Sequence, residues 1–232
     1  MKQAKTKSHI IICNWNYKAQ DLIREFRSDN KTANAPIVIL AEEEYKPVDD
    51  EDVLFVRGDP TAEEALKKAG LREAETVIVL LDENVEVYSR DAKVILTALT
   101  IESMRPDVYI CAELLDPENV RHAQRARADE ILVTGEMSSK LLARSAIDHG
   151  ISHVVSELVC GQYGNSFYKI SAPRSFLGKP VGELFAYLKD RHNITLISLE
   201  RDEQHISNPP SDTRIQEGDY LVVLAEQRPQ VS

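Results

Sequence analysis

The sequence predicts an α/β fold: a doubly wound parallel sheet, then a crossover helix pair, then a small C-terminal α+β lobe. Short continuous apolar runs, which are typical of strands buried on both faces, recur six times between residues 9 and 134. Segments with helical periodicity separate these runs, and such alternation predicts a parallel sheet. Beyond residue 134 the pattern changes to two short helices and then to short strands.

The first apolar run, HIIIC at residues 9–13, is expected to be the central strand, and a helix with one apolar face begins at Tyr17. The other strands of this Rossmann-like lobe are expected at residues 37–41, 53–56, 77–81, 108–112 and 130–133. A second helix, with Thr61 as its expected cap, should end near Gly70, as helices that stop at glycine do. Further helices are expected at residues 85–103 and from residue 116 onward.

The rest of the chain divides at glycine residues. Helices are expected at residues 138–149 and 151–160, with Gly150 between them, and strands at 167–172, 193–200 and 220–226. The expected organisation is therefore an N-lobe at 1–135, crossover helices at 136–163 and a C-terminal lobe at 164–232. The crossover helices have little in their own chain to cover them, which predicts a homodimer. The side chains expected to be buried between subunits are Leu141, Leu142, Ile147, Val154, Val155 and Leu158.

Composition excludes several classes of protein. The formal net charge of −10 argues against nucleic acid as a partner, because phosphates call for a basic surface. No apolar run approaches the roughly 18 residues that a membrane helix needs, and the N-terminus lacks the apolar core of a signal peptide. Cys13, Cys111 and Cys160 lie in apolar runs and are expected to be reduced and buried. A cytosolic protein, or the cytosolic part of a membrane protein, fits these properties.

Several motifs together resemble the regulator of K+ conductance (RCK) family of ligand-gated potassium channels and Trk/Ktr-type transporter subunits. They are IIICNW at 10–15, LAE at 40–42, RGDPT at 57–61, AETVIV at 74–79, RAD at 127–129, and NPP at 208–210 with EGD at 217–219. The GDPT and NPP elements look more like the channel branch, with TrkA-N and TrkA-C type lobes. The resemblance implies that homodimers assemble into an octameric gating ring below a membrane pore domain.

The chain departs from the family at the positions that would bind ligands. Asn14, Asn16 and Ala19 occupy the three glycine positions of the dinucleotide motif G-x-G-x-x-G. Arg127 stands where the family usually has glycine. Of the carboxylates that bind calcium in related channels, only Glu113 has a counterpart here, and the other two positions align with Leu80 and Leu115.

A nucleotide site is expected where the strand order of the sheet reverses, between the first and fourth strands. Residues expected around it are Asn14, Trp15, Asn16, Leu81 and Asp82, with Glu42 able to hold a ribose hydroxyl and Asp59 also assigned to the cofactor site. An adenine nucleotide (ADP, ATP or NAD) is the candidate ligand. The loss of the glycines weakens the prediction that a nucleotide binds here. The alternative is an inherited fold in which Trp15 fills the space.

A cation site is the second candidate. Its expected ligands are Asp82, Glu83, Glu86, Glu113 and Asp116, which lie at or just past the ends of the fourth and fifth strands. Carboxylate oxygens are the ligands that Ca2+ prefers, and another cation is the alternative. Acidic loops are more often solvated surface than ligand sites, so a solvated surface without a bound ion is the alternative interpretation of these residues. His149 and His153 lack a third ligand and are not expected to bind zinc.

The expected function is regulatory. A ligand that prefers one arrangement of lobes and subunits would shift the population and control potassium flux through a channel pore at the inner face of the cell membrane. The chain has no nucleophile elbow, metalloprotease motif or P-loop, so we do not expect an enzyme. A free-standing Trk/Ktr transporter subunit and, less favoured, an NAD(P)-dependent oxidoreductase remain the alternatives.

Overall fold

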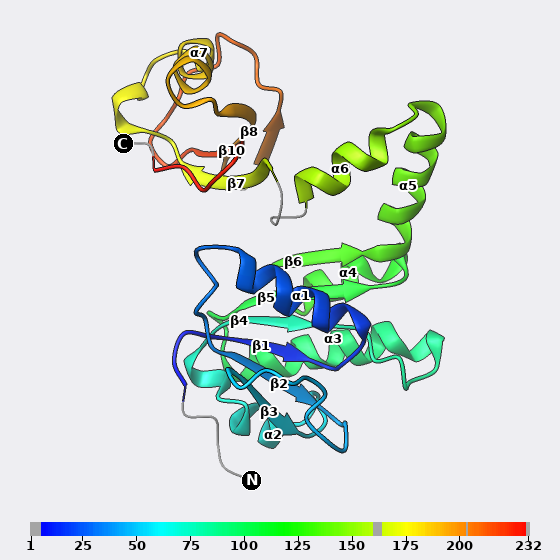
Figure 1. Cartoon of the computed structure of the whole chain (residues 1–232). Coiled ribbons are helices and arrows are strands. Elements are labelled where there is room, and N and C mark those ends of the chain that lie inside the picture. The colour runs from blue at the N-terminus through cyan, green and yellow to red at the C-terminus, as the bar shows by residue number, and fades with distance from the viewer. Residues whose placement is uncertain (1–5, 160–163, 203, 231–232) are drawn as a thin grey trace. The chain divides into compact units, whose positions relative to one another are not determined.

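The computed structural model describes residues 6–159, 164–202 and 204–230, and the chain divides into two compact units (Figure 1). The first unit comprises Met1–Ile147 and the second Asp148–Ser232. The division falls between the two crossover helices, so each unit carries one of them. Among the described residues, no helix has both the length and the apolar character that crossing a membrane requires.

A six-stranded parallel sheet with the order β3-β2-β1-β4-β5-β6 forms the centre of the first unit. Its strands are β1 His9–Cys13, β2 Ile37–Ala41, β3 Val53–Arg57, β4 Ala74–Val79, β5 Tyr109–Leu114 and β6 Glu130–Val133. Ile11 lies in register with Val38 of β2 on one side and with Val77 of β4 on the other. The strand order reverses between β1 and β4, which confirms the predicted doubly wound, Rossmann-like fold.

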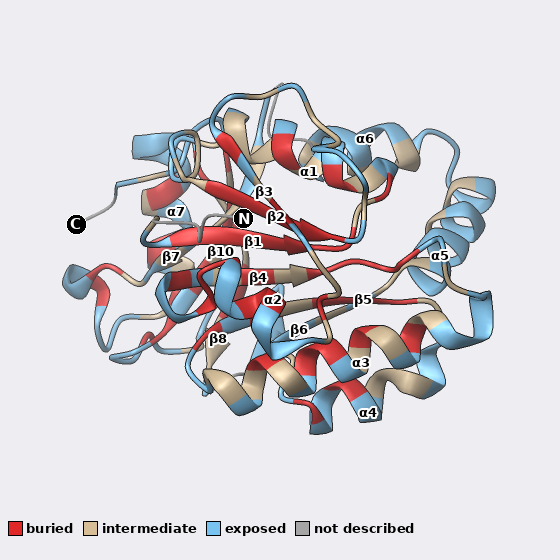
Figure 2. Ribbon diagram, turned by 90° about the horizontal axis from the view of Figure 1, so that it is seen from below, coloured by how far each residue is buried: buried red, intermediate tan, exposed pale blue. Residues whose placement is uncertain are grey.

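Helices cover both faces of this sheet. They are α1 Tyr17–Ser28, α2 Glu63–Lys68, α3 Val87–Met104 and α4 Val120–Arg125, with short 3-10 turns η1 Leu71–Glu73 and η2 Pro117–Asn119. Figure 2 shows the buried strands between α1 on one side and α3 and α4 on the other. Alternate residues of β1 supply the two cores: Ile10 and Ile12 pack on the α1 side, and Ile11 packs with Leu66 of α2 and Val94 of α3.

Some element boundaries differ from those predicted. β4 begins at Ala74, three residues before the apolar run, and its last predicted residues, Leu80 and Leu81, follow the strand. The predicted cap of α2 is wrong: the N-cap is Ala62, without a side-chain bond, whereas Asp59 Oδ1 accepts a hydrogen bond of 2.9 Å from the Thr61 backbone N–H. The acidic side chain two residues before Thr61 therefore organises this turn.

The second unit contains a four-stranded antiparallel sheet with the order β7-β10-β8-β9. Its strands are β7 Ser166–Ser171, β8 Thr195–Arg201, β9 Gln204–Ser207 and β10 Tyr220–Ala225. The 3-10 turn η3 Arg174–Phe176 and the helix α7 Val181–His192 pack on one face, where Leu184 and Leu188 are fully buried against Leu199 and Leu221. β7, β8 and β10 were predicted from the sequence, whereas α7 and β9 were not.

The crossover helices are α5 Thr134–Ile147 in the first unit and α6 Ile151–Val159 in the second, with Gly150 between them at φ +92°. α5 starts directly after β6, four residues earlier than predicted. Among the described residues of α5 and α6, none is buried within the chain. Their burial in a dimer stays a prediction.

The cysteines of the first unit are free thiols in its sheet. Cys13 is buried at the end of β1, and burial raises the pKa of its thiol; Cys111 of β5 is partly buried, and burial also raises its thiol pKa. Both therefore stay protonated at neutral pH. Cys160, the predicted end of the second crossover helix, lies outside the described residues.

Candidate ligand-binding site

Asn14 directly follows β1, in the position of the first glycine of the dinucleotide motif. Its backbone is left-handed, with φ +67°, and its buried side chain donates a hydrogen bond of 2.8 Å to the Leu80 carbonyl. Arg127, which also stands where the resemblance implies glycine, has a positive φ of +59°, whereas Asn16, in the second glycine position of the motif, has φ −148°. Asparagine tolerates this backbone conformation better than most residues. The local backbone that glycine would favour is thus present without glycine.

Asn16 closes the N-terminus of α1. Its Oδ1 accepts a hydrogen bond of 3.0 Å from the Lys18 backbone N–H, and its Nδ2 donates one of 3.0 Å to the Leu81 carbonyl. A capping side chain occupies a backbone donor that a phosphate would otherwise use. Ala19, in the third glycine position, is fully buried and lets α1 approach the sheet. Trp15 is partly buried and packs against the core on the α1 side of the sheet.

Glu113, at the end of β5, forms an ion pair with Lys18 of α1. Its Oε1 accepts a hydrogen bond from Lys18 Nζ, and its Oε2 accepts one of 3.2 Å from the Leu81 backbone N–H. The carboxylate is only 5% exposed. A buried charge needs a compensating partner, and Lys18 supplies it.

Asp82, Glu42 and Asp59 converge on one ammonium group, that of Lys93 on α3. Lys93 Nζ lies 2.7 Å from Asp82 Oδ2, 2.7 Å from Glu42 Oε2 and 3.9 Å from Asp59 Oδ1. The remaining oxygen of Asp82, Oδ1, accepts a hydrogen bond of 2.9 Å from the Asn84 backbone N–H. We refer to Glu42, Asp59, Asp82 and Lys93 as the strand-end cluster, because the three acids follow β2, β3 and β4.

Lys93 is a cation at neutral pH. Burial disfavours its charge, but the hydrogen bonds to Asp82 and Glu42 and the attraction of their carboxylates outweigh burial and raise the pKa of Lys93. The Lys93 side chain is 14% exposed and Asp82 is 6% exposed. This ion pair is therefore screened little by solvent, in contrast to pairs on the surface.

The other acids predicted for the cation site lie outside these contacts. Glu83, Glu86 and Asp116 are exposed, and Asp116 Oδ1 accepts a hydrogen bond of 2.9 Å from the Glu118 N–H to cap η2. Within the described part of the chain, no three His, Cys, Asp or Glu side chains are grouped so that they could hold a metal ion. All four carboxylate oxygens of Asp82 and Glu113 already have partners in the chain. The residues present therefore do not form a ready-made cation site.

Sequence reasoning missed three residues that organise this edge of the sheet. Lys18 and Lys93 pair with acids that are far away in sequence. Asp91 of α3 is buried, and it accepts hydrogen bonds of 2.9 Å from the Leu115 N–H, 3.0 Å from the Asp116 N–H and 2.8 Å from Asn119 Nδ2. Its signal was that it is the one acid among the residues spaced to lie on the inner face of α3, the others being Val94, Thr97, Ala98 and Ile101.

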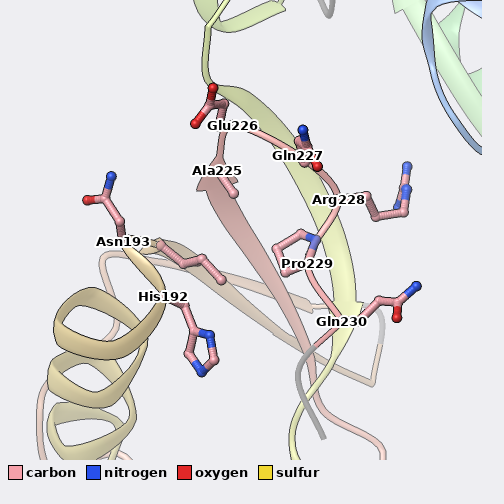
Figure 3. A pocket seen from close by; sticks show the side chains of 9 residues that line it. His192, Asn193, Ala225, Glu226, Gln227, Arg228, Pro229 and Gln230 are labelled. Carbon is pink, nitrogen blue, oxygen red and sulfur yellow. The ribbon is translucent and has the colours of Figure 1, made fainter.

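The second unit contains a cavity of about 450 Å³ (Figure 3). The end of α7, including His192 and Asn193, lies on one side, and the segment from Ala225 to Gln230 lies on the other. Among the described residues that line it, Glu226 is the one carboxylate. The cavity thus lacks the several acids that a divalent cation needs, and it contains none of the residues predicted to bind ligands.

The chain thus combines a doubly wound lobe, with charged side chains at the switch point of its sheet, and a small antiparallel lobe. Residues 5–112 match the family described as the calcium-activated potassium channel slowpoke-like RCK domain, and residues 167–228 match the TrkA-C domain. The chain therefore carries an RCK domain and a TrkA-C domain, and the resemblance seen in its sequence is confirmed.

Curated relatives are potassium channel proteins. The chain is 32% identical to the "Calcium-gated potassium channel TvoK" of Thermoplasma volcanium, over 99% of this chain and 65% of that protein. It is 26% identical to the "Putative potassium channel protein YugO" of Bacillus subtilis, over 95% of this chain and 66% of that protein. The chain thus spans about two thirds of the length of these relatives. These matches favour a potassium-channel regulatory domain over a transporter subunit or an oxidoreductase.

Solved structures agree on the fold. The human SLO3 gating ring superposes with a TM-score of 0.71 at 16% identity, over 94% of this chain and 44% of that chain. The TrkA-N domain of the inner membrane protein ybaL from Escherichia coli superposes with a TM-score of 0.52 at 13% identity, over 61% of this chain and 98% of that chain. At these identities the likeness concerns the fold alone.

Proposed function

We propose that this chain is the ligand-sensing regulatory domain of a potassium channel and controls potassium flux through a membrane pore. The observation that carries the proposal is the 32% identity to TvoK over 99% of this chain; the name of that protein describes a calcium-gated channel. The pore would lie in the same or a partner chain, and the domain would work at the cytoplasmic side of the membrane. Because the match is to channel proteins, we favour regulation over catalysis.

The proposed assembly is a homodimer through α5 and α6, and eight copies in a ring. Leu142 and Ile147 of α5 and Val154 of α6 are exposed in the single chain. Exposed apolar side chains of this kind are expected where a second subunit would cover them. A closed ring needs a second, different contact surface on each domain. Leu96 and Leu99 on the exposed face of α3 offer one.

For the ligand we propose a divalent cation, with calcium the first to test. Asp82 follows β4 and Glu113 lies near the end of the neighbouring strand β5. Both are nearly fully buried, and their charges are balanced by Lys93 and Lys18. Cation binding here requires that these lysines release the carboxylates. Each release exchanges one buried charge pair for another, so the lysines and the helices that carry them, α1 and α3, respond to the ligand.

An adenine nucleotide is the second candidate, favoured by the left-handed backbone of Asn14 and by the position of Glu42 at the end of β2. Two contacts oppose it. Asn16 already caps α1, and Lys93 already binds Glu42. A nucleotide would therefore have to displace both contacts.

The test is the thermal stability of the purified chain with CaCl2, MgCl2, NaCl, ADP, ATP and NAD, for the wild type, Asp82→Asn and Glu113→Gln. A ligand that binds only the folded state stabilises it by about 2.7 kcal/mol at one hundred times its Kd. We expect CaCl2 to raise the Tm of the wild type and of a matched control, Glu118→Gln, an exposed acid near the same strand ends. A calcium shift that survives in Asp82→Asn and Glu113→Gln would refute the assigned residues. A shift with nucleotide alone would favour the second candidate.

A further inference from the structure

β9 lies at the edge of the sheet in the second unit, and its side chains are exposed. Among the described strands it pairs only with β8, and all four of its residues are exposed. Burial of apolar side chains therefore contributes little to its attachment. A strand held chiefly by solvent-exposed backbone hydrogen bonds opens more readily than the central strands of a sheet. A single side-chain contact can thus decide how firmly β9 stays attached.

Glu200 of β8 lies directly opposite His205 of β9, and its two carboxylate oxygens differ. Oε1 accepts a hydrogen bond of 2.6 Å from Lys169 Nζ, whose ammonium also lies 4.9 Å from the centroid of the Tyr220 ring on β10. Oε2 is buried and has no hydrogen-bond partner among the described residues. A buried acceptor without a donor costs stability, so a donor added at Oε2 would stabilise the sheet.

His205 is placed to supply that donor. Its Nδ1 lies 3.5 Å from Glu200 Oε2, which is longer than an ordinary hydrogen bond. A protonated imidazole carries a positive charge and donates from both nitrogens, and a charge-assisted bond to a carboxylate is stronger than a neutral one. Histidine is the side chain that ordinarily changes charge between about pH 5 and 8. Protonation of His205 would therefore strengthen its contact with the oxygen that Lys169 leaves unsatisfied.

The other charged groups near His205 do not compete for this contact. Arg201, which follows Glu200 on β8, donates hydrogen bonds of 2.8 Å to both oxygens of Asp219 and is occupied there. Asp202, in the turn between β8 and β9, is exposed, and its charge favours the protonated histidine as that of Glu200 does. The positive charge that opposes protonation is that of Lys169, which is held on the other oxygen of Glu200.

We propose that His205 and Glu200 form a pH-dependent clasp, in which protonation of His205 fastens β9 to the sheet of the second unit. The attached strand offers the imidazolium a carboxylate that the detached strand lacks. Attachment is therefore favoured at low pH, and it weakens as the pH rises and His205 loses its proton. This inference goes beyond the proposed function and depends on neither its ligand nor its dimer.

The segment that follows β9 connects the clasp to α7. A proline pair at 209–210 stiffens the chain directly after β9. The next residues then satisfy the first turn of α7: the Val181 N–H donates a hydrogen bond of 2.7 Å to the Thr213 carbonyl, and the Gly182 N–H one of 2.8 Å to the Ser211 carbonyl. Attachment of β9 thus helps to position the carbonyl groups on which the start of α7 depends.

The experiment measures amide hydrogen exchange by NMR on the full 232-residue chain at about pH 5.5 and about pH 8, corrected for the intrinsic pH dependence of exchange. Residues 204–207 should exchange about two- to fivefold more slowly at the lower pH, as expected of a partly exposed ion pair, while β7 and β10 stay unchanged. His205→Gln, which cannot become charged, and Glu200→Gln, which removes the negative charge, should both abolish the difference. The matched control is His153→Gln, an exposed histidine of α6 in the same unit, which should retain it.

Three results would overturn the inference. The first is equal exchange of β9 at both pH values in the wild type, and the second is a pH difference that persists in His205→Gln. The third is a wild-type difference of the same size in β7 and β10, because a clasp on an edge strand acts on the opening of that strand and not of the whole unit. If Glu200→Gln unfolds because Lys169 loses its partner, His205→Gln carries the test alone, since His205 is 61% exposed and outside the core.

Discussion

Asp219 is predicted to be the residue on which the second unit depends most strongly for stability. Its carboxylate is fully buried and accepts hydrogen bonds of 2.8 Å each from Arg201 Nε, from Arg201 Nη2 and from the Gln216 backbone N–H. In Asp219→Asn the guanidinium loses its counter-charge, and at least one donor faces an NH2 group. Breaking a buried ion pair from one side costs about 3–5 kcal/mol. Because Arg201 is partly solvated, we expect about 3 kcal/mol, a large part of the 5–15 kcal/mol that usually stabilises a domain.

The assay must report on this unit alone, because a chain with two units need not unfold in one step. Trp15, the one tryptophan in the sequence, lies in the first unit, so its fluorescence does not follow the second. Hydrogen exchange measured on peptides from residues 164–202 and 204–230 gives the opening free energy of the second unit directly. Asp212→Asn, an exposed acid in the same connection, is the control and should change stability by less than about 0.5 kcal/mol. An equally small effect of Asp219→Asn would refute the reasoning.

The same ion pair predicts how the second unit responds to acid. Burial raises the pKa of Asp219, but the hydrogen bonds and charge of Arg201 and the Gln216 N–H outweigh burial and hold that pKa below its ordinary value. A carboxylate with a lowered folded-state pKa stabilises the fold above its unfolded pKa of about 3.9, and that stability is lost as pH falls through the folded pKa. Exchange protection should therefore stay level from neutral pH to about pH 5 and fall below about pH 4. In Asp219→Asn this contribution to the acid response should be absent.

Three further predictions concern the first unit and the crossover helices. Gly58→Ala places a Cβ 2.8 Å from the Cβ of Ala65 in α2. This contact should destabilise the first unit by about 1–3 kcal/mol, measured by denaturant melts. The control is Gly135→Ala, whose new Cβ would have no neighbouring atom closer than 3.7 Å. Asn16→Ala removes the cap of α1 and should cost about 1 kcal/mol in the same melts, and an unchanged midpoint would contradict the capping role. Leu158→Asp should dissociate the proposed dimer, as measured by light scattering. Ser156→Asp, at an exposed position of α6, is the control and should leave the dimer intact. A dimer that persists in Leu158→Asp counts against the interface.

The sheet could be predicted because burial on both faces leaves a direct trace in the sequence. All five residues of β1 and all five of β2 are buried. β2 is an unbroken apolar run, and β1 is one after its first residue, His9. β4 was placed too late because its first residues include Glu75 and Thr76, which break the apolar run. Thr76 pairs with Ile10, and Glu75 lies at a shift in the register between β1 and β4, which the sequence does not show. α7 was missed although Val181, Leu184 and Leu188 repeat at helical spacing.

The candidate site was predicted less completely than the sheet. Asn14, Asn16, Asp82 and Glu113 lie at the strand ends because parallel strands bring their carboxyl ends to one edge, and the alternation of strands and helices predicts such a parallel sheet. The lysines could not be placed in this way. Lys18 and Glu113 are 95 residues apart, and contact between two long side chains depends on helix rotation and on rotamers, which no short motif encodes.

The contacts at the strand ends also bear on how a ligand could control this domain. Asn16 supplies the cap that α1 needs, and Lys18 and Lys93 supply the charges that Glu113 and Asp82 need, so the ligand-free arrangement is already satisfied. A ligand shifts such a domain only by the difference between the contacts it makes and those it displaces. The displaced contacts here all come from α1 and α3, so the exchange of a lysine for a cation changes what holds these two helices to the sheet. With Leu96 and Leu99 on the exposed face of α3, that exchange would act directly on a surface proposed to join neighbouring domains in the ring.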